Sequence, residues 1–319
     1  MKKGCAASFG CSGIIIILLF AILIIDFIAN LNVSFDGFEE TESDYTFEVD
    51  SIGNQKIITS DFKWKFTSAS LGRKSYSISF QLLEKEVQKA LAYVDDIAKL
   101  SARELNIDPR YKSDQIYYSK LVWHEIYKRI YWQAFDKFDN ILSGFDEVFK
   151  KEKLTDTDKI YFIISFVQNI KYKRPGGELD LLPPLGTLAT KYGDCDTKAL
   201  LLYVILEKVG VDCVMFWSFQ YKHAMLGISI TARGNYKSIN NKKYYFVETT
   251  YPGWMIGDID PEMDDLSMWF IDDIDSDKMN INYNLKDEKI QNNFENKGRI
   301  IENENDESGK RDKASPSIN

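Results

Sequence analysis

The sequence predicts an α+β fold in which helices pack on an antiparallel β-sheet. Apolar and polar residues alternate in two separate parts of the chain, at 57–68 with 75–80 and again between 211 and 250. Between these parts the apolar residues recur at steps of three and four, which is the period of amphipathic helices. Of the 319 residues, 45% are hydrophobic and 14% are aromatic, which is ample for a packed core.

The N-terminus carries an apolar run that predicts a membrane anchor. From Ala6 to Ile25 there are 20 residues, about the length that a helix needs to cross a bilayer core. A cleaved signal peptide is the alternative, but Phe27-Ile-Ala29 offers only one of the two small residues that cleavage requires. Lys2 and Lys3 precede the run and acidic residues follow it, so the positive-inside bias predicts a single-pass protein with residues after 30 outside the cytoplasm.

The patterns divide the chain into four regions. We expect an anchor at 1–30, a spacer with strands and a helical region at 31–154, a core at 155–275, and a tail at 276–319. Helices are expected to begin at about 83, at about 113 (running to about 150) and at Thr155 (running to Tyr172), the last one apolar nearly all round and therefore buried. The tail is rich in Asn, Lys, Glu, Asp and Ser and cannot bury enough apolar surface to fold, which predicts disorder.

Several classes of function are excluded by composition. The net charge is −8 and no basic stretch has interleaved aromatic residues, so we expect no nucleic-acid partner. There is no glycine-rich phosphate loop and no Cys-x-x-Cys pair, which argues against a nucleotide or a structural zinc ion. An acidic run from Asp258 to Asp265 suggests calcium, but it lacks the glycine and the glutamate of a calcium loop, so a solvated loop is favoured. No cofactor or metal is predicted.

The most informative stretch surrounds Cys195. Gly193 permits a tight turn, and the mostly apolar run from Asp194 to Val209 predicts a helix that ends at Gly210. Cys195 then lies in the first turn, where free backbone N–H groups and the helix dipole favour the thiolate and lower the thiol pKa. Two other interpretations stay open, because a cysteine is also a common buried apolar residue and Cys213 could pair with it in a disulfide.

Three strands are predicted after this helix, and two of them carry polar residues suited to activate a thiol. His223 starts the strand 223–230, and Glu248 lies near the end of the strand 243–250. Pairing of these strands would bring His223 and Glu248 side by side, so that the imidazole could take the thiol proton while the carboxylate orients the ring. The other histidine, His124, lies on an aromatic helical stripe, where packing explains it as well as function does.

These motifs together resemble the transglutaminase-like superfamily of thiol enzymes. The residues that carry the resemblance are Thr187-Leu188, Gly193-Asp-Cys195, Ala199-Leu-Leu-Leu202, Gly210-Val211 and His223-Ala224. Further segments are similar to a microbial branch that contains transglutaminase-like proteins and cysteine peptidases, namely Phe166 to Tyr172, Glu248-Thr-Thr250, Pro252-Gly-Trp254 and Ile256-Gly257. The resemblance covers 155–262 well and 57–154 loosely.

The resemblance implies a papain-like core with Cys195 as nucleophile, His223 as general base and Glu248 as the orienting acid, where most of the superfamily has Asp. It also implies that Gln168 faces this region, either to help hold an oxyanion or as a buried structural amide. The thiolate would attack an amide carbonyl of a protein or peptide, and water or an amine would resolve the thioester. The alternative from another class is an inactive module of the same fold that binds peptides or acts as a scaffold at the membrane.

Overall fold

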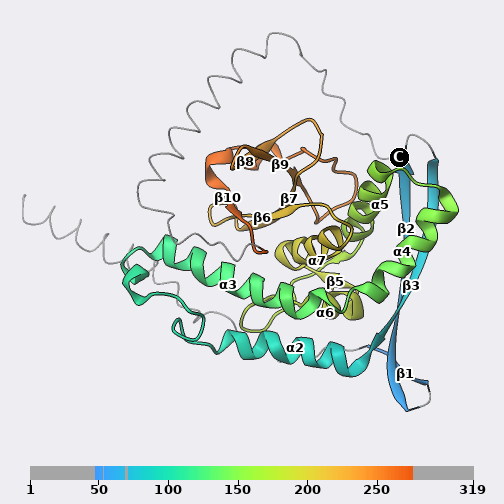
Figure 1. Ribbon diagram of the computed structural model, residues 1–319, viewed down its shortest axis with the longest axis horizontal. Coiled ribbons are helices and arrows are strands. Elements are labelled where there is room, and N and C mark those ends of the chain that lie inside the picture. Colours follow the sequence, from blue (N-terminus) through green and yellow to red (C-terminus); the bar gives the residue numbers. More distant parts are fainter. Residues whose placement is uncertain (1–46, 53, 69–70, 276–319) are drawn as a thin grey trace, which may run out of the picture.

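The computed structural model describes residues 47–52, 54–68 and 71–275, and this part of the chain has the predicted α+β architecture. In Figure 1 the long ribbon of β2 and β3 runs along one side, and a curled five-stranded sheet lies opposite the ribbon. The helix α2 lies near the bottom, and α3 lies above α2 and below the five-stranded sheet. The helix α7 lies between these layers and contacts helices and strands alike.

The first sheet is an antiparallel ribbon of β1 (Val49–Ile52), β2 (Gln55–Ser68) and β3 (Gly72–Leu83). Both predicted strands of this region are confirmed, and they extend beyond the predicted limits. Alternate residues of β2 are buried, and Phe62, Trp64 and Phe66 pack edge-on or tilted against Phe162 and Phe166 of α5. The period-two pattern thus places one face of the ribbon on the core.

Four helices follow: α2 (Glu84–Ala98), α3 (Gln115–Phe135), α4 (Asp139–Glu152) and α5 (Asp156–Gln168). The single stretch predicted from 113 to 150 is therefore two helices, because the chain turns at 136–138 and buries Phe138 completely. This turn lets α4 pack on β3, where Gly144 lies against Ile78 and Phe80. A short 3₁₀ turn, η1 (Pro109–Ser113), precedes α3.

The helix predicted from Thr155 to Tyr172 ends earlier, at Gln168, and its expected last residues form β4 (Lys171–Tyr172). This short strand pairs in parallel with β5 (Tyr192–Gly193), which follows α6 (Pro184–Thr190). The next helix, α7 (Cys195–Lys208), agrees with the predicted one, and each residue from Thr197 to Leu206 is buried. It is thus a central helix covered on every side.

The second sheet contains β6 (Cys213–Ser218), β7 (His223–Ile228), β8 (Tyr236–Ile239), β9 (Lys242–Val247) and β10 (Phe270–Asp272). Its strand order is β10-β6-β7-β9-β8, all neighbours are antiparallel, and the sheet curls into a half-barrel. One face packs on α7. A small apolar cluster covers the other face beneath the turns η2 (Pro261–Met263) and η3 (Leu266–Met268).

The predicted anchor at 1–30 and the predicted tail at 276–319 lie outside the described residues. Within the described part, no helix combines the length and the apolar character that crossing a bilayer requires.

Candidate functional site

The turn before α7 is shaped to present Cys195 as the first helical residue. Asp194 is the N-cap, and its carboxylate accepts a long hydrogen bond from the backbone N–H of Thr197 (3.4 Å). At Gly193 a Cβ atom would come within 2.5 Å of the Thr197 side chain, so the close approach of turn and helix requires glycine. The thiol of Cys195 is partly buried and lies within hydrogen-bonding reach of the backbone N–H groups of Ala224 and Asp196.

His223 and Glu248 are brought together by the pairing of β7 with β9. His223 is the first residue of β7, and Glu248 directly follows Val247, the last residue of β9. The Nε2 atom of His223 lies 2.9 Å from Oε2 of Glu248. This bond leaves Nδ1 as the ring nitrogen available to a thiol.

The Glu248 carboxylate is fixed by a second set of donors. Its Oε1 atom accepts hydrogen bonds from the backbone N–H (2.7 Å) and the hydroxyl (2.6 Å) of Thr250. Burial raises the pKa of Glu248, but the hydrogen bonds and charge from His223 and Thr250 outweigh burial, and the pKa is lowered. The carboxylate is therefore ionised at neutral pH and can hold one orientation of the imidazole.

The structure places Cys195 beside this pair without a hydrogen bond to it. Ala224, whose N–H reaches the sulfur, is the residue after His223 in β7. Within the described residues, the His223 ring forms a hydrogen bond with Glu248 and none with the sulfur of Cys195. Catalytic hydrogen bonds are often long in ligand-free sites and shorten when substrate is bound.

The electrostatic surroundings of the thiol differ from the sequence expectation. We expected the helix N-terminus to lower the pKa of Cys195, but burial, together with the negative charges of Asp196 and Asp194, raises it well above the ordinary value. The N–H groups of Ala224 and Asp196 act in the opposite direction and are outweighed. In this arrangement burial is the main factor that favours the neutral thiol of Cys195, and the charges of the two aspartates that flank it in sequence act in the same direction.

The carboxyl groups of these two aspartates interact directly with each other. Both carboxylates accept from the same Thr197 N–H, at 3.4 Å for Asp194 and 2.9 Å for Asp196, which holds them close together. Burial and the charge of Asp194 raise the pKa of Asp196 well above its usual range, and burial raises the pKa of Asp194. Asp196 is therefore the one of the two that holds its proton more strongly. Its Oδ2 atom also accepts a hydrogen bond from the hydroxyl of Tyr127 (3.2 Å).

Tyr127 belongs to α3, which lies across one side of the site. Three side chains spaced along α3 hold it there: Tyr127 contacts Asp196, the Lys120 amine lies 3.7 Å from the centre of the Phe270 ring, and His124 pairs with Asp272. Two of these partners come from β10, the edge strand of the curled sheet. The helix thereby closes the α3 side of Cys195.

The pair of His124 with Asp272 was missed by sequence reasoning. The Nδ1 atom of His124 lies 2.6 Å from Oδ1 of Asp272, and the two side chains are only 1% and 7% exposed. Burial lowers the pKa of His124, but the hydrogen bond and charge of Asp272 outweigh burial, and the pKa is raised. The buried stripe of α3 implied that His124 needs a partner, but nothing in the sequence identified Asp272.

Gln168 and Lys198 are buried beneath the site and bind backbone carbonyls. The Nε2 atom of Gln168 donates to the carbonyls of Glu248 (2.9 Å) and Trp254 (3.0 Å), so both of its N–H groups are already used. This geometry favours the structural amide over the oxyanion donor that we considered. Lys198, which is 0% exposed, donates to the carbonyls of Gln168 (3.2 Å), Ile170 (2.8 Å) and Thr250 (2.9 Å).

Burial lowers the pKa of Lys198 to about 7, and the charge of Glu248 opposes this effect. Three carbonyl acceptors call for all three N–H bonds of an ammonium group, so the hydrogen-bond geometry favours the charged form. Lys198 and Gln168 together tie the end of α5 to the loop that follows Glu248. They were not recognisable as such from the sequence, because an apolar helix gave no sign that one lysine points inward.

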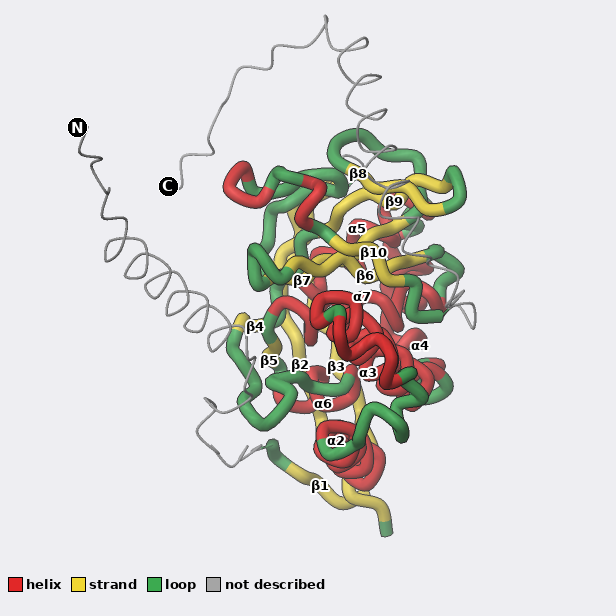
Figure 2. The backbone as a smooth tube through the Cα atoms, turned by 90° about the vertical axis from the view of Figure 1, so that its left-hand side faces the viewer, coloured by secondary structure: helices red, strands yellow, loops and turns green. Residues whose placement is uncertain are grey.

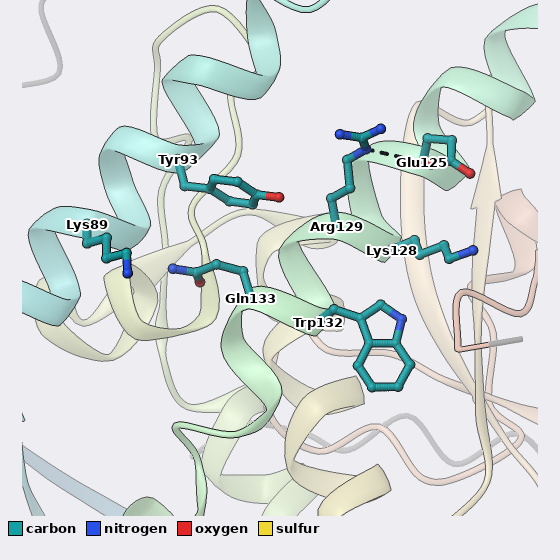
Figure 3. Close-up of a pocket in the computed structure, with 7 residues that line it drawn as sticks. All are labelled: Lys89, Tyr93, Glu125, Lys128, Arg129, Trp132 and Gln133. Atoms are coloured by element: carbon teal, nitrogen blue, oxygen red, sulfur yellow. Dashed lines mark ion pairs between the residues drawn. The ribbon is translucent and has the colours of Figure 1, made fainter. Parts of the chain in front are cut away.

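The other sequence candidates take structural roles. Cys213 and Cys195 are both free thiols, and the Cys213 backbone N–H donates to Glu207 (2.6 Å). Asp258, Asp260 and Asp265 each accept a backbone N–H in a turn, and the described residues contain no cluster of potential metal ligands. The pocket in Figure 3 lies between α2 and α3, and none of the predicted site residues lines it.

The arrangement unites, at one end of α7, a thiol, an imidazole with an ionised orienting carboxylate, and two backbone N–H groups directed at the sulfur. Such a set can deprotonate a thiol and stabilise negative charge at a carbonyl under attack. Comparison with known proteins finds no matching family model, no matching curated protein and no matching solved structure.

Proposed function

We propose that this chain is a thiol enzyme of the transglutaminase-like type that cleaves or transfers amide bonds of proteins or peptides. The hydrogen bond between His223 and Glu248 carries the proposal, because it prepares an imidazole next to the residue whose N–H contacts the Cys195 sulfur. A papain-like core with a helix-borne cysteine facing a sheet-borne histidine is consistent with α7 packing on β6 and β7.

In the proposed reaction Nδ1 of His223 takes the proton of the Cys195 thiol, and Glu248 stabilises the imidazolium through Nε2. The thiolate then forms a C–S bond with the amide carbonyl, and the electron pair returns from the oxyanion as the C–N bond breaks. The imidazolium gives its proton to the departing amine. Water attacks the resulting thioester and regenerates the thiol, which makes the enzyme a peptidase or amidase; attack by an amine would make it a transglutaminase.

The surroundings of the Cys195 thiol disfavour the deprotonation that this reaction requires. Burial and the charges of Asp196 and Asp194 oppose the thiolate, so the imidazolium must form next to the sulfur as a compensating charge. The same surroundings favour a second candidate, a module of this fold that has lost catalysis and binds peptides or acts as a scaffold. A neutral thiol of ordinary reactivity would fit that second function.

The location of the site is a further part of the proposal. A helix at 6–25 would hold the chain in a membrane with the site outside the cytoplasm, where surface proteins or peptides are the available substrates. No cofactor, metal or nucleic acid has a role in the proposed reaction.

The decisive experiment is the pH dependence of iodoacetamide alkylation at Cys195 in the full chain. Peptide mass spectrometry separates this cysteine from Cys5, Cys11 and the buried Cys213. An enzyme is expected to show an alkylation midpoint below the ordinary thiol value of about 8.5 that is lost in His223→Ala and Glu248→Ala. A midpoint at or above the ordinary value, unchanged in His223→Ala, would contradict catalysis and favour the binding module.

A further inference from the structure

Two exposed tyrosines stack on one another beside the candidate site. Tyr172 is 41% exposed and Tyr251 is 59% exposed, and their ring centroids lie 6.0 Å apart with an angle of 22° between the planes. We propose that this tyrosine shelf, made of Tyr172 and Tyr251, binds an aromatic side chain of the substrate peptide next to the amide bond that Cys195 attacks. The inference rests on the proposed function and names its substrate class.

Tyr172 is tied to the loop that carries the nucleophile. It lies opposite Gly193 in the parallel pair of β4 with β5, and the next residue, Lys173, donates its N–H to the Gly193 carbonyl (3.1 Å). Figure 2 shows β4 and β5 side by side. Burial raises the pKa of Tyr172 to about 12, and Cys195 makes the largest charge contribution to this increase. The pairing of β4 with β5 thus places Tyr172 beside the turn that leads into Cys195.

Tyr251 is tied to the loop that carries the orienting carboxylate. The carbonyl of the preceding residue, Thr250, accepts from Lys198 (2.9 Å), and the carbonyl of Trp254 accepts from Gln168 (3.0 Å). Two buried donors thus hold the loop on either side of an exposed ring. Lys198 and Gln168 thereby fix the backbone on which the Tyr251 ring is held, and a rigid backbone reduces the entropy lost when a ligand stacks on the ring.

The shelf is formed by elements other than α3, namely β4 and the loop that follows β9. On the α3 side the site is closed by Tyr127, which is 4% exposed, whereas Cys195 itself remains partly exposed. Tyr172 pairs with the turn that leads into Cys195 and remains exposed, and Tyr251 stacks on it. An exposed pair of aromatic rings prefers an aromatic or other flat apolar partner, and Met255 (53% exposed) extends the apolar surface along the same loop.

The test compares two alkylating reagents of similar length on the full chain, N-phenethyl iodoacetamide and N-(2-hydroxyethyl) iodoacetamide, with plain iodoacetamide as reference. The aromatic reagent is expected to react with Cys195 roughly three- to ten-fold faster than the polar one, as contact with an aromatic pair provides. Tyr251→Ala and Tyr172→Ala are expected to remove this preference, while Tyr251→Phe keeps it. Trp132→Ala is the matched control, because Trp132 is 47% exposed but lies on the part of α3 that lines the other pocket.

The outcomes separate the shelf from the proposed function. An activated thiol with no aromatic preference, or a preference that survives both alanine variants, would overturn the shelf and leave the enzyme proposal standing. A preference that Trp132→Ala removes would also overturn it, because a distant surface would then be responsible. A thiol of ordinary reactivity toward plain iodoacetamide would refute the proposed function and the shelf together.

Discussion

The hydroxyl of Thr250 offers the sharpest test of how the candidate site is held. It donates a 2.6 Å hydrogen bond to Oε1 of Glu248, whose other oxygen bonds His223. Thr250→Val removes this donor and keeps the shape of the side chain. The backbone N–H of Thr250 still donates to Oε1 (2.7 Å), so this oxygen loses one hydrogen bond and keeps another.

The expected cost follows from the charge of the acceptor. A hydrogen bond to an ionised group contributes about 1.5–3 kcal/mol to the free energy of unfolding, about twice the contribution of a neutral bond. For a folded region of this size each kcal/mol lowers the melting temperature by about 2–4 °C, so a decrease of roughly 3–12 °C is expected at about pH 7.

The cost should also depend on pH in one direction. Glu248 has a lowered pKa in the folded protein, so its contribution to stability is present above its ordinary value of 4.5 and is lost as pH falls through the folded pKa. Removing the hydroxyl raises the folded pKa, because a bond to the ionised form is lost. The difference between Thr250→Val and the parent protein should therefore shrink in acid.

Thermal unfolding between about pH 3 and pH 7 measures both effects. Thr187→Val is the matched control, because the Thr187 hydroxyl is fully buried but donates to a neutral carbonyl, that of Pro183 (3.2 Å). Its cost should be smaller and independent of pH over this range. An equal cost for the two variants, or a Thr250→Val cost that is unchanged in acid, would show that the hydroxyl does not stabilise an ionised Glu248.

Three further predictions concern other parts of the molecule. Because the pKa of His124 is raised above its ordinary 6.5 by Asp272, the stability from this pair is present below that value and lost as pH rises through the folded pKa; urea unfolding should show this slope, and Asp272→Asn should abolish it. Gly227→Ala should cost about 1–3 kcal/mol in urea unfolding, because its Cβ would lie 2.6 Å from two side chains of β6, and an unchanged midpoint would contradict this packing. Since Cys195 and Cys213 are free, dithiothreitol should leave the melting temperature unchanged, and a decrease would reveal a disulfide.

The parts of the fold that the sequence predicted are those with their own repeating pattern. The helix α7 and the strands β6, β7 and β9 have apolar runs long enough to specify their type. The strand β10 has three residues and exists because β6 offers it hydrogen-bonding partners, so no local pattern could reveal it. The break at 136–138 was missed for the same reason, since the turn is fixed by where α4 packs.

For the candidate site, too, the sequence predicted one part and missed another. The closeness of His223 and Glu248 followed from strand pairing, which the sequence pattern shows. The state of the thiol did not follow, because it depends first on the burial of Cys195 and then on the nearby carboxylates of Asp194 and Asp196. Burial is a property of the packed chain, and Tyr127, which bonds Asp196, lies 69 residues earlier in the sequence.

The position of Asp272 has a consequence for the order in which the chain can assemble. His124 is separated from this partner by 148 residues, and β10 is the last strand of the described region. A chain emerging from the ribosome therefore completes α3, α7 and the strands that carry His223 and Glu248 before the acid that pairs with His124 exists. Until then, docking of α3 would bury an unpaired imidazole, so α3 should close over Cys195 only after β10 has been synthesised.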